Sequence, residues 1–313
     1  MTDPLPAPSV TPVSRAAWER ACARAGAPMP FGDLPWTDLG LTGDPALRFS
    51  PVVLGWEGEG ELLVPLCLNR GRSQIGCFGY GIVWPLGNWR RERLPDFPVL
   101  ARALARTVGH NRVGTLLPPA GVVPALDGLV EHWDGDAGRD TYVLDLTGGV
   151  DSVWAAARGS SRTAVRRAGA HGLTVREGRP KDVARLLDLH RDTMTRNDAV
   201  TAYDKDQVDF LLRGPGAGAL TVLAEDADGV HAASVFGVGA HAAFHIMQLT
   251  SEHGRRNNAG HLAFWDGVTA LVGAGVQVLD LGSAANVGQE RFKANWGALP
   301  KASRVVQWKE EQR

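Results

Sequence analysis

Residues 230–251 limit the fold of this chain more than any other part of its sequence, because they contain no Asp, Glu, Lys or Arg. An uncharged run of this length can cross a bilayer as a helix. Four polar side chains and two glycines interrupt the run: His231, His241, His245, Gln248, Gly237 and Gly239. Paired buried strands explain such interruptions better than a membrane helix does. We therefore predict strands here and no membrane-spanning segment.

The second half of the sequence has an α+β pattern. Apolar runs bounded by glycines predict three consecutive strands over residues 219–225, 230–237 and 242–250. A helix, a buried strand, a helix and a last strand are predicted next, over residues 259–272, 276–281, 289–296 and 302–308. Upstream, we expect helices over residues 151–158, 162–171, 181–196 and 205–213, and a strand over 173–177.

The first half is predicted to be a degenerate version of the same plan. Its expected elements are helices over residues 14–26 and 96–109, a hairpin over 47–69, and strands over 113–117 and 141–146. The composition shifts near residue 148. We therefore predict a disordered, proline-rich leader over residues 1–13, an N-terminal lobe over 14–148 and a C-terminal lobe over 149–313.

Charge and cysteine usage exclude several classes of protein. The 313 residues include 33 Lys and Arg against 34 Asp and Glu, so the formal net charge is -1. No global field attracts nucleic acid, and such a partner has to be held by a local patch. Cys22, Cys67 and Cys77 form no CxxC pair. Neither a zinc cluster nor a disulfide framework is predicted, no metal site is expected, and a cytoplasmic location is the natural interpretation.

Three segments of the second half carry a resemblance to a known family. They are residues 161–175, residues 190–197 with the element Thr193 to Arg196, and residues 279–297 with Asp-Leu-Gly followed by Phe-Lys and Trp-Gly. Together they resemble the Fem-type (FemABX-like) aminoacyltransferases of the GNAT superfamily. Segments 34–36, 64–66 and 79–81 fit the corresponding places in the first half. The resemblance implies two tandem GNAT-like lobes, each a mixed, mostly antiparallel sheet flanked by helices.

The donor loop departs from the usual GNAT pattern. Coenzyme A-dependent members cradle a pyrophosphate on backbone amides at a helix amino terminus. Residues 254–261 keep Arg255, Arg256 and Gly260 but lose the spacing of that motif. Fem-type enzymes, which take their acyl group from aminoacyl-tRNA, have the same degeneration. The resemblance therefore implies an aminoacyl-tRNA donor and no cofactor, with an acyl-CoA donor as the alternative.

The implied activity is transfer of an amino acid from aminoacyl-tRNA to an amine of a peptidoglycan precursor or a peptide-like small molecule, forming an amide bond. An acyl-CoA-dependent N-acyltransferase is the alternative. A third possibility, from another class, is a catalytically inactive duplicated fold that binds a peptide or sugar precursor without turnover. Fold analogy alone does not separate these.

Lys293 is the strongest catalytic candidate. The chain has only five lysines, and Lys293 lies beside the apolar Phe292 at the Phe-Lys position of the family signature. A buried ammonium at this position stabilises the oxyanion that forms when an amine attacks an ester. Asp280, at the end of a buried strand, and His245, in an apolar strand, are the other two catalytic candidates; a structural carboxylate and a core histidine are the alternatives.

Substrate contacts are predicted from the remaining polar and aromatic positions. The substrate-binding candidates are Arg196, Phe292, Trp36, Tyr80 and Trp84, and the tRNA-binding candidates are Arg162, Arg166 and Arg167. A guanidinium holds phosphate or carboxylate through two hydrogen bonds. Each group has a structural alternative: an arginine that offsets a helix dipole, packed aromatics, and a solvated basic face.

Overall fold

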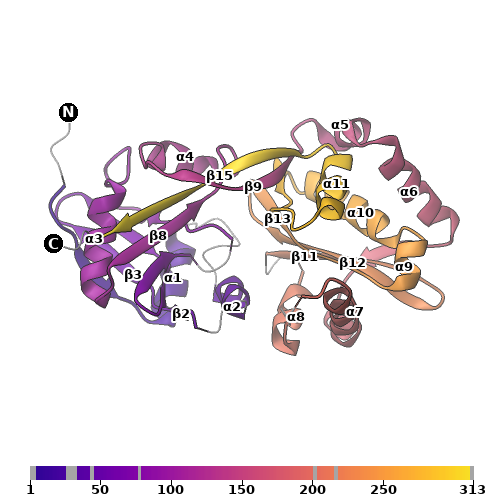
Figure 1. Cartoon of the computed structure of the whole chain (residues 1–313), viewed down its shortest axis with the longest axis horizontal. Helices are drawn as coiled ribbons and strands as arrows, with labels where there is room; N and C mark the ends of the chain where they lie inside the picture. The colour runs from indigo at the N-terminus through magenta and orange to yellow at the C-terminus, as the bar shows by residue number, and fades with distance from the viewer. Residues whose placement is uncertain are drawn as a thin grey trace. The chain divides into compact units, whose positions relative to one another are not determined.

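The computed structural model describes residues 5–25, 34–42, 46–76, 79–199, 203–214 and 218–310 of the chain (Figure 1). It divides into two compact units. The first unit is Met1–Arg139 together with Ala302–Arg313, and the second is Asp140–Lys301. The chain passes between them within two strands, β9 (Asp136–Asp145) and β15 (Leu299–Lys309).

The second unit is built on a six-stranded sheet. Its strands are β10 (Thr174–Glu177), β11 (Ala219–Asp226), β12 (Gly229–Val238), β13 (Ala242–Thr250), β14 (Val278–Asp280) and β9. They pair in this order, antiparallel throughout except that β13 and β14 run parallel. The register sets Phe244 opposite Asp280. The predicted meander over residues 219–250 is thereby confirmed.

Helices cover both faces of this sheet. They are α5 (Gly149–Ala156), α6 (Gly159–Ala170), α7 (Val183–Arg196), α8 (Lys205–Leu211), α9 (Glu252–Arg256), α10 (Ala259–Gly273) and α11 (Val287–Asn295). A short 3-10 turn, Pro180–Asp182, precedes α7. Helix α10 packs on β11, β12 and β13, and α7 packs on β12 and β13 from the opposite face (Figure 1). Phe236, Phe264, Leu279 and Trp296 form the centre of the buried core between α10, α11 and the sheet.

The first unit contains two groups of strands and four helices within its described residues. One group is ordered β1 (Ser9–Pro12), β3 (Val52–Trp56), β4 (Gly60–Val64) and β7 (Trp84–Pro85). The other runs from β15 through β8 (Arg112–Leu117), β6 (Arg72–Ile75) and β5 (Leu66–Asn69) to β2 (Arg48–Phe49), with only β6 and β8 parallel. The helices are α1 (Arg15–Ala25), α2 (Leu34–Thr42), α3 (Phe97–Val108) and α4 (Pro124–Val130). The predicted α+β class, with mixed and mostly antiparallel sheets, is confirmed.

The predicted disordered leader contains an ordered strand. Residues Ser9–Pro12 form β1, which pairs antiparallel with β3. The indole Nε1 of Trp56 also donates to the Pro6 carbonyl at 2.8 Å. Four prolines remove amide donors from this segment, but an edge strand needs hydrogen bonds on one side only. Prolines therefore allow an ordered edge strand here.

The ends of the units differ from the predicted lobes. The predicted boundary near residue 148 lies just after the end of β9. The compact units instead separate within β9, between Arg139 and Asp140. The last predicted strand pairs with β8 and therefore belongs to the first unit. Cys77, one of the three cysteines considered above, lies outside the described residues. Within the described residues, no helix combines the length and the apolar character that a bilayer-spanning segment requires.

Helix α10 offers a matched test of its packing on β12. A Cβ atom added at Gly267 would overlap the ring of Phe236, whereas one added at Gly273, in the last turn of the same helix, meets nothing within 4 Å. We expect Gly267→Ala to lower the free energy of unfolding by about 1–3 kcal/mol because of overpacking. Gly273→Ala should leave it unchanged or raise it by up to about 1 kcal/mol. Urea unfolding measures both, and equal effects would contradict this packing.

Candidate active site around Lys293

Lys293 is a buried cation held by backbone oxygens. Helix α11 starts at an Asn286 cap whose side chain accepts from the amide of Gln289 at 3.0 Å. The helix carries Lys293 inward, leaving it 7% exposed. Its Nζ donates to the carbonyls of Gly282 and Ser283, both at 2.8 Å. An ammonium has three donors, so these two bonds leave one N–H for a further acceptor.

Burial dominates the electrostatics of Lys293. Desolvation lowers the pKa of the Lys293 ammonium to about 8, and the nearby Asp280 carboxylate opposes this change. The ring of Tyr142 lies 5.8 Å from Nζ, at a distance where an aromatic face attracts a cation. Lys293 is therefore mostly charged at pH 7 and close to the pH at which it releases its proton.

Asp280 holds the loop that presents these carbonyls. Its side chain is 2% exposed and accepts hydrogen bonds from the Thr141 hydroxyl and from the Gly282 amide, the latter at 2.7 Å. Gly282 has φ 71°, a backbone conformation that residues with a side chain rarely adopt. The tight turn after β14 thus aims two carbonyl oxygens at Lys293. Asp280 acts through this loop as a positioning residue.

His245 belongs to a hydrogen-bond network of polar groups beside α10. Its Nε2 lies 3.1 Å from the Ser234 hydroxyl, which donates to Gln248 Oε1 at 3.1 Å. In that arrangement Nε2 carries the ring proton. The Gln248 amide nitrogen donates in turn to the carbonyls of Ala233 and Gly260, both at 3.3 Å. This hydrogen-bond network therefore links His245 to the amino-terminal turn of α10.

Burial and charge keep His245 neutral. Desolvation is the main cause and the Lys293 ammonium adds to it, and together they lower the pKa of His245 to about 3. The imidazole packs between the rings of Phe236 and Phe264, with centroids 5.1 and 5.3 Å away. The expected catalytic histidine lies near Lys293, but at neutral pH it is a poor proton acceptor.

Phe292 lines an aromatic layer beside Lys293. Its ring lies 5.3 Å from that of Phe264 and 5.3 Å from that of His261. Burial lowers the pKa of His261 as well. The sequence analysis missed His261, because its place on the first turn of α10 is informative only once α11 is known to pack there. Phe292 is half-buried, and its contact with a substrate stays a prediction.

Arg196 is engaged with the end of β13. Its guanidinium donates to the Thr250 carbonyl at 3.1 Å from the last turn of α7. Burial lowers its pKa, the positive charge of Arg255 lowers it further, and Asp192 partly offsets both. The structure thus brings Arg196 close to an arginine of the donor loop. Its binding of an acceptor remains a prediction.

The three predicted tRNA-binding arginines on α6 differ in their surroundings. Arg162 donates to the carbonyls of Trp154, Ala155 and Ala157, at 3.1, 3.1 and 2.6 Å, and so caps the carboxyl end of α5. All three bonds come from Nη1, so this structural task engages one nitrogen of the guanidinium, and binding of tRNA by Arg162 stays a prediction. Arg166 and Arg167 are exposed, and Arg166 lies 5.6 Å from the Trp154 ring. Their binding of tRNA stays a prediction.

The three predicted groove aromatics are buried in the first unit. Trp36 is fully buried in α2, and Tyr80 and Trp84 are 7% and 5% exposed. The interior of the unit needs large apolar side chains, and this packing explains their presence. Trp36 has no exposed surface, so its predicted contact with a ligand is corrected. Tyr80 and Trp84 expose little surface, and their contact with a ligand stays a prediction.

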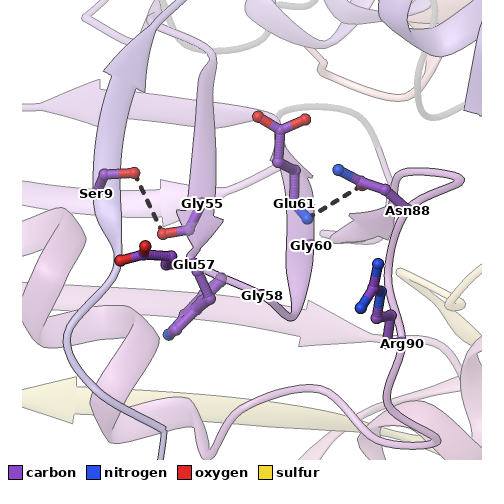
Figure 2. A pocket seen from close by; sticks show the side chains of 9 residues that line it. Ser9, Gly55, Glu57, Gly58, Gly60, Glu61, Asn88 and Arg90 are labelled. Carbon is purple, nitrogen blue, oxygen red and sulfur yellow. Dashed lines mark hydrogen bonds between the residues drawn. The ribbon is translucent and has the colours of Figure 1, made fainter.

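The first unit has a surface pocket of its own. It has a volume of about 490 Å³ beside the β3–β4 turn (Figure 2). Its polar lining includes Glu57, Glu61, Asn88 and Arg90, and Asn88 accepts from the Glu61 amide at 3.2 Å. No residue of the predicted site lines this pocket.

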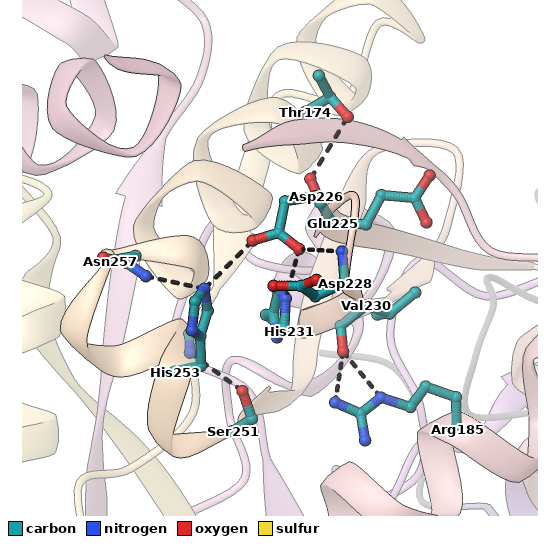
Figure 3. Close-up of polar contacts among 11 residues, drawn as sticks. Thr174, Arg185, Glu225, Asp226, Asp228, Val230, His231, Ser251, His253 and Asn257 are labelled. Atoms are coloured by element: carbon teal, nitrogen blue, oxygen red, sulfur yellow. Dashed lines mark hydrogen bonds and ion pairs between the residues drawn. The ribbon is translucent and has the colours of Figure 1, made fainter. Parts of the chain in front are cut away.

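A cluster of Asp226, His231 and His253 was also missed by the sequence analysis (Figure 3). Asp226 ends β11, His231 lies near the start of β12, and His253 is in α9. The sequence contained one signal, since the first two residues flank the predicted turn at Gly229. The third comes from beyond another strand, and no short spacing motif connects it to them.

Comparison with known proteins finds a similarity in the second unit. Residues 155–294 match the family model described as an acetyltransferase (GNAT) domain. This segment of the chain is therefore similar to a GNAT acetyltransferase domain. It contains Lys293, Asp280, His245, Arg196 and the donor loop. No curated protein is similar in sequence to the chain.

Solved structures resemble both units of the chain. The crystal structure of FemX is 10% identical, covers 96% of this chain and 97% of its own, and has a TM-score of 0.65. L-PGS from Bacillus licheniformis (13% identical, 97% and 94% covered) scores 0.58. The C-terminal domain (DUF2156) of a putative lysylphosphatidylglycerol synthetase from Agrobacterium fabrum (16%, 95% and 93%) scores 0.57. The predicted Fem-like GNAT fold is confirmed over nearly the whole chain.

The low pKa of His245 predicts acid sensitivity. The ring is neutral in the fold down to about pH 3, whereas an unfolded histidine binds a proton near pH 6.5. Between these values the unfolded chain binds the extra proton, so stability falls as the pH falls, by at most about 1.4 kcal/mol per pH unit from this group. Urea unfolding of wild type and His245→Gln at pH 7, 6, 5 and 4 measures it. The variant should lose less stability on acidification; equal slopes would contradict the assignment.

Proposed function

We propose that this chain transfers an aminoacyl group from aminoacyl-tRNA to an amine of a peptidoglycan precursor or a peptide-like small molecule. The observation that carries the proposal is the buried Lys293 ammonium, fixed by two carbonyls within the GNAT domain. The Fem-like fold supports the same class of reaction. The name lysylphosphatidylglycerol synthetase, given to another structure of this fold, also describes an aminoacyl product. A tRNA donor implies a cytoplasmic reaction.

The chemical step is amide formation at an ester carbonyl. The lone pair of the acceptor amine attacks the carbonyl carbon, and the carbonyl oxygen becomes an oxyanion. The remaining N–H of Lys293 donates to this oxygen, in a site where low exposure strengthens the interaction. Collapse of the intermediate breaks the bond to the ribose oxygen, which takes up the proton lost by the amine. No redox partner is required.

His245 does not act as the general base that removes the proton from the acceptor amine. With a pKa near 3 and its Nε2 directed to Ser234, His245 has little affinity for that proton at pH 7. The amine therefore enters as the free base or releases its proton to water or to the substrate. His245 is a neutral polar side chain beside Lys293, so the ammonium has no second positive charge near it from this residue.

An acyl-CoA donor is the second candidate, because the matching family model describes an acetyltransferase. In that case Arg255, Arg256 and the amides at the start of α10 hold the pyrophosphate. The retained glycine has another explanation, however. A Cβ at Gly260 would lie 2.9 Å from Thr250 Cγ2 and 3.2 Å from Gln248 Nε2, so packing on β13 already requires a glycine there.

A donor screen separates the two candidates. The protein is incubated with an extract of small molecules and either mixed aminoacyl-tRNA or a panel of acyl-CoA thioesters, and the products are analysed by mass spectrometry. We expect mass gains equal to amino-acid residues that disappear after ribonuclease treatment. Gains with a thioester and release of free thiol would move the chain to the acyl-CoA class. Ligand binding without transfer from either donor would favour an inactive binding protein.

Lys293→Ala tests the oxyanion role. We expect a fall in kcat of about 10²–10³-fold, the usual cost of removing one preorganised donor. Lys301→Ala, which removes an exposed lysine of β15, is the matched control and should keep wild-type rates. Circular dichroism verifies that both variants fold. A folded Lys293→Ala protein with wild-type kcat would refute the assignment.

A further inference from the structure

The Asp226 carboxylate contacts two imidazoles in the second unit (Figure 3). Its Oδ1 lies 2.7 Å from His231 Nε2, and its Oδ2 lies 3.2 Å from His253 Nε2. The two imidazole rings are tilted against each other, with centroids 4.2 Å apart and planes inclined by 33°. One donor atom from each of the three side chains lies within 4.8 Å of the others. Two imidazoles and one carboxylate therefore converge on one small volume.

The separations fit a tetrahedral cation. At bond lengths of 2.0–2.1 Å, the ligand atoms of tetrahedral zinc are about 3.3 Å apart. The 2.7 and 3.2 Å contacts of Asp226 are slightly shorter than that edge. The three groups therefore have to move apart slightly to admit an ion between them. None of these residues is needed for the chemistry proposed at Lys293.

The hydrogen bonds around His253 Nε2 conflict in one orientation of the Asn257 amide and agree in the other. His253 Nε2 faces the Asp226 carboxylate, which requires a proton on that nitrogen. The same Nε2 lies 2.9 Å from the Asn257 Nδ2, which requires a lone pair there. One ring nitrogen has either the proton or the lone pair, never both. A half-turn of the Asn257 amide places Oδ1 there, which accepts from the protonated Nε2. When that proton is lost to a metal ion, Oδ1 is the fourth ligand atom, which gives two nitrogens and two oxygens.

Two residues of the cluster are held in place by the fold, and the third is exposed to solvent. His231 is buried, and the Asp228 amide donates to Asp226 Oδ1 at 2.9 Å, which fixes the carboxylate. The side chain of His253 is 43% exposed, so an ion can reach the cluster from solvent. The carboxylate supplies a negative charge to offset a cation. Imidazole and carboxylate ligands suit divalent ions of the first transition row.

We propose that Asp226, His231 and His253, with Asn257 as the fourth group, bind a divalent transition metal ion of the zinc type. The ion replaces the proton at His253 Nε2 and joins α9 to the β11–β12 turn. Gly254 already brings α9 so close that a Cβ there would overlap the His231 carbonyl. Because Arg255 is in α9, the ion also fixes the position of the donor loop relative to the sheet.

Zinc binding is tested on the full-length, untagged protein after chelator treatment and dialysis. Titration calorimetry with zinc chloride should give one equivalent bound. His253→Ala, which removes an exposed ligand and leaves the core intact, should weaken binding by about 10- to 100-fold or more. Asn257→Asp, which adds a second carboxylate, should tighten it. His171→Ala removes an exposed histidine at the end of α6 and is the matched control.

Thermal unfolding provides a second measurement that does not depend on transferase activity. Excess zinc should raise the midpoint of wild type and of His171→Ala, because the ion binds the folded state, and should raise that of His253→Ala much less. Absence of a one-to-one binding event would overturn the site. Equal binding by wild type and His253→Ala would also overturn it and would indicate adventitious binding at other histidines.

Discussion

The burial of one ammonium group governs the arrangement of the second unit. Removing a charge from water costs several kcal/mol unless hydrogen-bond partners replace the lost hydration. Lys293 finds these partners in two carbonyls of a loop that Asp280 and Gly282 hold in a tight turn. The turn follows directly from β14, and the ammonium reaches it from α11. The end of the sheet, the loop and the helix are therefore fixed together.

The same charge determines the chemistry of its neighbours. His245 stays neutral because burial and the Lys293 ammonium both disfavour its protonation. A neutral ring can share the interior with Phe236 and Phe264, and its proton is used by Ser234. The site is thus polarised by a single cation. It is suited to stabilising negative charge that develops on a substrate and less suited to removing protons.

Regular local patterns made much of the fold predictable. The strands over residues 219–250 were predictable because apolar runs alternate with glycine turns. Lys293 was a candidate because lysines are rare and its neighbours are apolar. Exposure was harder to predict, because it is decided by tertiary contacts. Trp36 has no exposed surface, and Arg162 caps a helix that no motif links to it. The Asp226 cluster joins two sides of a turn to a later helix, so its members are adjacent only in the fold.

Lys293 is held by main-chain oxygens, which every residue type possesses. The side chain of Ser283 can therefore change without removing an acceptor from the ammonium, whereas Gly282 is restricted by its positive φ. A site built in this way requires few specific residue types: one lysine, one glycine and the aspartate that orders the loop. Chains of this fold can diverge widely in sequence and still form the same cationic site.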